Sequence, residues 1–174
     1  MFIIKKLWNK IKKLPRKIAA STGIDAMAHA IECFTSNKAN PFSDTFALKA
    51  FDLIINNIEA ACDDKTADDA RNNMLIAAFY AGVAITASGT TAVHALGGKY
   101  HIPHGVSNAI MLAPVMKFNE PVVREKFAAA YDRVNHNGDA SLSVEEKSAW
   151  VLDRMCSIIK HLDIPTSLKE YGVS

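Results

Sequence analysis

Apolar residues recur every three or four positions along most of the chain beyond residue 22, with polar residues between them. This spacing is typical of amphipathic α-helices, because residues three and four apart share one face of a helix. The β-branched clusters are too short and too isolated to build a sheet. The pattern therefore predicts an all-α protein, a bundle of packed helices.

Capping and turn-forming residues divide this pattern into separate helices. Thr22, Ser43 and Ser143 are the expected N-caps, because a side-chain oxygen at that position accepts a free N–H of the first turn. The segment 66–87 is apolar on all sides, which favours a place at the centre of the bundle. The segment 88–105 is interrupted by Gly, His and Pro and is expected to be a largely irregular passage, where functional residues often lie. The expected helices span about residues 22–34, 43–63, 66–87, 106–116, 120–134, 143–162 and 165–171.

The first 17 residues differ from the rest of the chain, because they carry seven basic residues and no acidic one. Their apolar side chains recur at helical spacing, which predicts a short basic amphipathic helix that Pro15 would end. We therefore divide the chain into an arm, residues 1–17, and a helical body, residues 18–174. The arm is expected to pack on the body or on a neighbouring molecule, and contact with a membrane surface is the alternative.

The charge distribution argues against a nucleic-acid-binding body. The formal net charge of the chain is +2, and it becomes −5 when the seven basic residues of the arm are left out. Proteins that bind nucleic acids need clustered Lys and Arg to neutralise phosphates. We therefore expect no nucleic-acid partner for the body.

The apolar content and the cysteines indicate the class and compartment of the protein. Hydrophobic residues make up 49% of the chain, enough for a core, yet no apolar run approaches the roughly 20 residues that span a bilayer. The three cysteines are widely spaced and give no disulfide pattern. A protein of the reducing cytoplasm is therefore expected.

Two groups of residues have the chemistry of metal ligands. Asp25 and His29 stand four apart in a predicted helix, so both side chains project from one face, close enough to hold one divalent cation. His94, His101 and His104 place three of the six histidines within eleven residues, beside several glycines. One carboxylate with two or three imidazoles suits Fe(II) or Zn(II), and an open position would admit an alcohol oxygen. The alternatives are an ordinary Asp in a first helical turn and a polar loop with surface histidines.

Two long segments, LPRKIAASTGIDAMAHAIECFTS and GTTAVHALGGKYHIPHGVSNAIMLAPVMKFN, resemble the two signatures of the iron-containing alcohol dehydrogenase family. The resemblance extends from about residue 14 to the C-terminus. It implies an all-helical C-terminal domain in which an aspartate and three histidines bind Fe(II), or Zn(II) in some members. It further implies an N-terminal α/β half that binds NAD(P), with alcohols oxidised to aldehydes or ketones in the cleft between the two halves.

Transferred motif by motif, the resemblance implies a set of metal ligands consisting of Asp25, His29, His94 and His104. His94 is in addition the candidate catalytic residue. An alternative stays open for His94, because relatives place about one more helical turn between this histidine and the PHG turn. Counting back from His104 puts Thr90 on the ligand position and His94 on that of a second, non-ligand histidine near the substrate.

Nothing in the sequence resembles the nucleotide-binding half of that family. There is no strand-rich segment, and no strand precedes the glycine pair at residues 97–98, as a dinucleotide-binding loop requires. We therefore expect a fragment of an oxidoreductase that is inactive as an isolated chain, with NAD(P) and a small alcohol or aldehyde serving only a complete enzyme. The alternative is a non-catalytic helical interaction protein derived from that domain. Its uncovered apolar surface would favour homo-oligomers.

Overall fold

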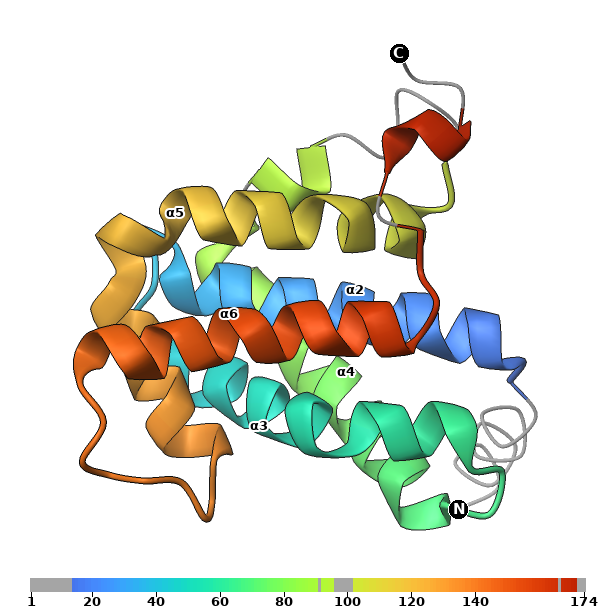
Figure 1. The fold of residues 1–174 in the computed structure, drawn as a ribbon, viewed down its shortest axis with the longest axis horizontal. Helices are drawn as coiled ribbons and strands as arrows, with labels where there is room; N and C mark the ends of the chain where they lie inside the picture. The colour runs from blue at the N-terminus through green and yellow to red at the C-terminus, as the bar shows by residue number, and fades with distance from the viewer. Residues whose placement is uncertain (1–13, 91, 96–101, 166, 172–174) are drawn as a thin grey trace.

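The computed structural model describes residues 14–90, 92–95, 102–165 and 167–171. This part of the chain forms five α-helices and two short 3-10 helices and contains no strand (Figure 1). The predicted all-α bundle is therefore confirmed. In chain order the elements are α2 (Arg16–Thr35), α3 (Pro41–Asp63), α4 (Asp68–Ser88), η1 (Ala92–Ala95), α5 (His104–Val134), α6 (Val144–His161) and η2 (Leu168–Tyr171).

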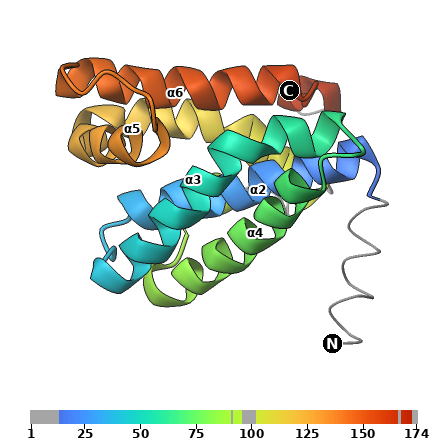
Figure 2. The same ribbon diagram turned by 90° about the horizontal axis from the view of Figure 1, so that it is seen from below.

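Helix α2 lies at the centre of the bundle and packs against α3, α4 and α5. Figure 2 shows α5 and α6 on one side of α2 and α3, with α4 on the other side. Small residues let neighbouring helices approach α2 closely, because short side chains leave room between the backbones. The buried residues of α2 are Ala20, Gly23, Ile24, Ala26, Met27, Ala28, Ala30, Ile31, Glu32, Cys33 and Phe34.

Helix α4 does not occupy the central place that its apolar sequence predicts. Its small residues, such as Ala77 and Ala81, are buried on the side that faces α2 and α3. Ala78, Phe79 and Gly82 on its other side are exposed, so the prediction of a central helix is wrong. An apolar surface on all sides of a helix does not show whether other helices cover all of it. Within the described residues, no helix is both long and apolar enough to cross a membrane.

The N-cap of α3 lies three residues before the predicted cap, Ser43. Asn40 is the N-cap: its side chain accepts the N–H of Ser43 at 3.1 Å, and the Ser43 hydroxyl accepts the N–H of Asn40 at 2.9 Å. Pro41 takes the first helical position, where its missing N–H leaves no bond unmade. Thr22, also a predicted cap, lies inside α2. Ser143 is confirmed as the N-cap of α6.

Helix α5 joins two segments that the sequence predicts as separate helices. It is bent at Val123 (φ −111°, ψ 15°), two residues after Pro121. Proline lacks an N–H and crowds the preceding turn, so it bends a helix whose two halves are held by other contacts. One such contact is Glu120, which accepts hydrogen bonds from Arg124 on α5 and from Ser148 on α6.

The start of α2 is fixed by ion pairs with distant parts of the chain. Arg16 lies 2.8 Å from Asp63 at the end of α3 and 3.2 Å from Asp163 beyond α6. Arg16 and Lys17, assigned from the sequence to the arm, are thus the first residues of α2. The predicted amphipathic helix of the arm lies in residues 1–13, outside the described residues.

Two phenylalanines of α5 test this packing, because Phe127 is 0% exposed in the core and Phe118 is 85% exposed. Phe127→Ala leaves a cavity and is expected to lower the free energy of unfolding by about 3–5 kcal/mol. Phe118→Ala should change it by less than about 0.5 kcal/mol. Urea unfolding followed by circular dichroism measures both. Equal losses for the two variants would contradict the packing described.

Candidate metal centre

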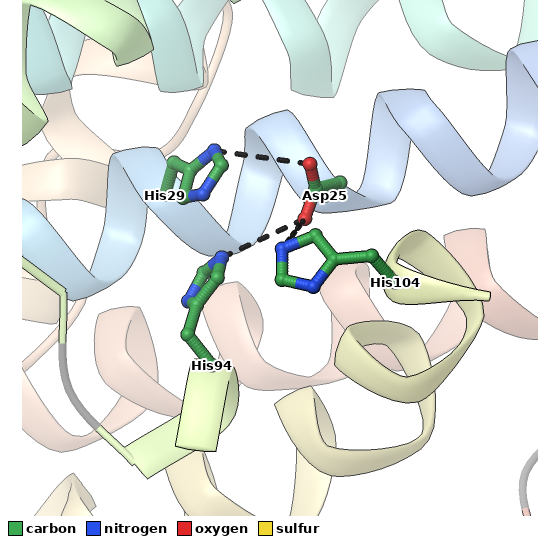
Figure 3. A group of neighbouring side chains, drawn as sticks. All are labelled: Asp25, His29, His94 and His104. Carbon is green, nitrogen blue, oxygen red and sulfur yellow. Dashed lines mark ion pairs between the residues drawn. The ribbon is translucent and has the colours of Figure 1, made fainter. Parts of the chain in front are cut away.

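Four side chains from three separate segments converge beside the middle of α2 (Figure 3). They are Asp25 and His29 on α2, His94 on η1 and His104 at the start of α5. One ligand atom of each lies within 4.8 Å of the others. We call these four side chains the Asp–His cluster.

The Asp25 carboxylate faces all three imidazole rings. Its Oδ1 atom lies 3.6 Å from Nε2 of His94 and 3.5 Å from Nε2 of His104. Its Oδ2 atom lies 4.0 Å from Nδ1 of His29. A tetrahedral ion with bonds of roughly 2.0–2.2 Å keeps its donor atoms about 3.4 Å apart. The observed separations are therefore close to those of a set of ligands around one ion.

Local structure explains why the cluster forms. Asp25 and His29 are one turn apart, as their spacing predicts, and both face the same neighbours. His104 reaches them because the first turn of α5 lies directly against α2. A Cβ atom at Gly105 would lie only 2.4 Å from the backbone oxygen of Ser21, so no larger residue fits there without moving one of the helices.

The three rings of the cluster differ in how closely they pack and how exposed they are. His29 and His94 are stacked, with centroids 4.2 Å apart and an angle of 11° between the planes. The centroids of His94 and His104 lie 5.3 Å apart. The His94 side chain is 11% exposed, whereas that of His104 is 57% exposed. His104 is therefore the most exposed ring of the cluster.

The Nε2 atom of His94 tests whether the cluster fits a cation. It is buried, faces Asp25, and has no hydrogen-bond partner among the residues that the structure describes. Its polar neighbour Oδ1 of Asp25 lies 3.6 Å away, beyond hydrogen-bond distance, and coordination to a metal would give this nitrogen a direct partner. With the carboxylate and two further imidazoles beside it, this nitrogen completes a donor set that fits a divalent metal.

Burial and the neighbouring charges act in opposite directions on the groups of the cluster. Burial by itself would raise the pKa of Asp25, but the nearby His94, His29 and Asn108 outweigh it, so that the pKa is lowered. Burial would lower the pKa of His94, but the Asp25 and Glu32 carboxylates outweigh it and raise that pKa to about 9. The pKa of His29 is lowered, mainly by burial. Without a metal, His94 therefore holds a proton at neutral pH.

Two buried polar residues that the sequence analysis did not single out contact the cluster. Asn108 donates a hydrogen bond to Oδ1 of Asp25 at 2.5 Å, and its amide nitrogen lies 3.1 Å from Nε2 of His104. Glu32 lies 2.5 Å from Nδ1 of His94, on the side away from Asp25. Both follow a predicted ligand on the same helix face, Asn108 four residues after His104 and Glu32 seven after Asp25. This helical spacing is the sequence feature from which Asn108 and Glu32 could have been identified.

Three further residues concern the alternatives for the site. His101, which the sequence groups with His94 and His104, is not among the described residues. Thr90, the alternative for the ligand position, is exposed in the segment after α4. His161 lies at the end of α6, where its ring pairs with Asp63.

Comparison with known sequences places this geometry in a family. The profile described as "Fe-containing alcohol dehydrogenase family, C-terminal" matches residues 19–174. Alcohol dehydrogenase 4 of Schizosaccharomyces pombe is 38% identical over 165 residues, which cover 92% of this chain and 38% of that protein. The 1,3-propanediol dehydrogenase of Citrobacter freundii is 35% identical over 163 residues, covering 91% of this chain and 42% of that protein.

Solved structures show the same fold for the matched part. The crystal structure of a 1,3-propanediol oxidoreductase superposes with a TM-score of 0.87 at 32% identity, covering 94% of this chain and 44% of that one. An alcohol dehydrogenase from Oenococcus oeni superposes with a TM-score of 0.85 at 30% identity, covering 94% and 43%. The chain thus spans about two fifths of the length of these relatives. It belongs to the Fe-containing alcohol dehydrogenase family and matches the C-terminal part of that family from residue 19 to residue 174.

Proposed function

We propose that the chain is the metal-binding part of an alcohol dehydrogenase, and that the Asp–His cluster holds Fe(II) or Zn(II). The observation that carries this proposal is the buried Nε2 atom of His94, which has no hydrogen-bond partner within the described chain and faces the Asp25 carboxylate. The family supports it, since the relatives are named as alcohol and propanediol dehydrogenases. The proposed ligands are Asp25, His29, His94 and His104.

The donor set of one carboxylate and three imidazoles suits both metals, because nitrogen and oxygen ligands of this kind bind Fe(II) as well as Zn(II). When bound, the metal supplies a positive charge that polarises the oxygen of an alcohol or a carbonyl compound. His94 is the candidate catalytic residue in the sense that its Nε2 atom would touch this cofactor. Asp25 provides the negative charge of the set.

The surrounding residues orient these ligands and control access to them. Asn108 donates to Oδ1 of Asp25 and so fixes the rotation of the carboxylate. The stacking of His29 on His94 holds the two rings side by side. The His104 ring is the most exposed of the three, and we propose that an alcohol would reach the cluster past it.

The reaction of a complete enzyme would convert an alcohol into an aldehyde or ketone, or the reverse. NAD(P) supplies the carrier of hydride in this chemistry. The described residues contain no strand, and folds that bind dinucleotides place the pyrophosphate at the end of a strand. We therefore propose that the nucleotide is held by a part of the enzyme other than this helical domain.

Metal titration of the pure chain tests the cluster directly. We expect one site for Zn(II), and for Fe(II) under anaerobic conditions, by isothermal titration calorimetry. Asp25→Ala and His104→Ala should each weaken binding at least about tenfold, because each removes a ligand. His161→Ala is the matched control, since that ring pairs with Asp63 away from the cluster and its loss should leave the affinity unchanged. A wild-type chain without a site, or equal weakening by His104→Ala and His161→Ala, would refute the assignment.

Metal affinity should increase with pH. The pKa of His94 is raised to about 9 in the metal-free protein, so a metal must displace a proton from this ring at neutral pH. Between about pH 6 and 7.5 the Zn(II) affinity is therefore expected to rise by up to about tenfold per pH unit. Calorimetry in buffers of different ionisation enthalpy measures the released proton, and His94→Gln should abolish that release. An affinity independent of pH over this range would be inconsistent with the proposed ligand.

Turnover by the isolated chain should be undetectable. The metal-loaded chain, mixed with NAD or NADP and 1,3-propanediol or ethanol, is expected to show no nicotinamide absorbance change above background. The 1,3-propanediol dehydrogenase of Citrobacter freundii, assayed in parallel, is the positive control. Robust activity of the pure chain that disappears in Asp25→Ala would show that the described helical domain does not need a separate nucleotide-binding part.

A further inference from the structure

Glu32 is a carboxylate in the middle of the core that nothing in the proposed chemistry uses directly. It is 0% exposed and lies in the apolar stretch of α2 that follows His29. A buried charge is costly unless well-placed partners compensate it. Both oxygens face η1: Oε1 accepts the backbone N–H of Val93 at 3.0 Å, and Oε2 lies 2.5 Å from Nδ1 of His94.

We propose that Glu32 is a positioning residue that holds the His94 ring with its Nε2 atom toward the metal. The inference rests on the proposed function, because it concerns the same cation. An imidazole whose Nδ1–H is donated to a carboxylate keeps Nε2 as the ligand atom, and the carboxylate also makes that atom a better donor. In the structure the nitrogen opposite Glu32 is the buried atom that faces Asp25.

The stacking of His94 on His29 could not fix this orientation alone. Two parallel rings 4.2 Å apart remain in contact when one ring turns by 180° about its Cβ–Cγ bond. Such a turn exchanges the nitrogen and carbon positions of the ring, so a carbon would then face Asp25. The contact between Nδ1 and Glu32 distinguishes the two orientations, because only one of them places a nitrogen beside the carboxylate.

One face of α2 carries two of the proposed ligands and also Glu32, because of the spacing of these residues. Residues 25, 29 and 32 are spaced by four and three, so Asp25, His29 and Glu32 project from the same side of the helix. The first two reach the cation directly, whereas the third reaches it through His94. Glu32 also binds the backbone of η1 at Val93. The same carboxylate therefore fixes both the position of η1 and the orientation of the His94 ring.

Metal binding by variants of the full chain tests this role. Glu32→Gln keeps the size of the side chain but replaces one of the two carboxylate oxygens by an NH₂ group, so the separate contacts of Oε1 with Val93 and of Oε2 with His94 cannot both be kept. We expect its Zn(II) affinity to fall by about 10–100-fold, the usual effect of losing a partner of a metal-bound histidine. We also expect the visible absorption bands of Co(II), a spectroscopic substitute for Zn(II), to shift in position and intensity. Glu32→Asp, which keeps the charge on a shorter side chain, should recover part of the affinity.

Asp52→Asn is the matched control, because Asp52 is a second buried carboxylate, on α3, that pairs with Lys49 and His136 outside the cluster. Its neutralisation should lower stability and leave the Zn(II) affinity and the Co(II) spectrum unchanged. Circular dichroism checks that each variant is folded. Should Glu32→Gln fail to fold, the same measurements on Glu32→Asp decide, with an affinity between about 2- and 10-fold below wild type expected.

The outcomes separate this inference from the proposed function. Weaker binding and an altered Co(II) spectrum in folded Glu32 variants, with both unchanged in Asp52→Asn, would support the positioning role. Wild-type affinity and spectrum in the Glu32 variants would overturn it while leaving the metal site intact. A wild-type chain that binds neither Zn(II) nor Co(II) would overturn the proposed function, and this inference with it.

Discussion

The close contact between α2 and the first turn of α5 is the constraint on which the site depends. Gly105 lies so near the backbone of Ser21 that a Cβ atom has no room, and this approach brings His104 within 3.5 Å of Asp25. The same turn carries Asn108, whose amide binds that carboxylate. If the two helices were separated by even one methyl group, the carboxylate would lose both contacts together. The geometry of the centre is therefore a property of helix packing as much as of the ligands.

The surroundings of the cluster are as informative as the four side chains themselves. Protein ligands of a metal must give up competing protons and be correctly turned to bind the ion, and neighbouring groups usually fix their orientation. Here Asn108 orients the carboxylate, and His29 stacks on the ring that Glu32 contacts. The burial of Glu32 in the apolar stretch of α2 therefore has a physical explanation, because its partner is a histidine of the Asp–His cluster.

The sequence predicts the all-α bundle and groups four candidate side chains that the structure brings together, and it fails where three-dimensional packing decides. Periodicity and resemblance identify the bundle and bring Asp25 and His104 into one group of candidates. The sequence predicts separate helices over residues 106–116 and 120–134, whereas in the structure α5 runs from His104 to Val134 and its bend lies at Val123, after Pro121. The central place of α2 was missed because close packing depends on small residues, which hydrophobicity alone does not reveal. Glu32 lies on the helix face of Asp25 and His29, and it was missed because its contact with His94 depends on the position of η1, which no local pattern encodes.

The contacts that support the four proposed ligands have a consequence for how a metal would be bound and released. The orientation of each donor is set by a contact within the protein: Asp25 by Asn108, His94 by Glu32, His29 by ring stacking, and His104 by the turn that packs on α2. Loading would then exchange protons for an ion with little movement of the backbone. A chelator that removes the ion should leave the four side chains in place, so that the site can bind a metal again without refolding.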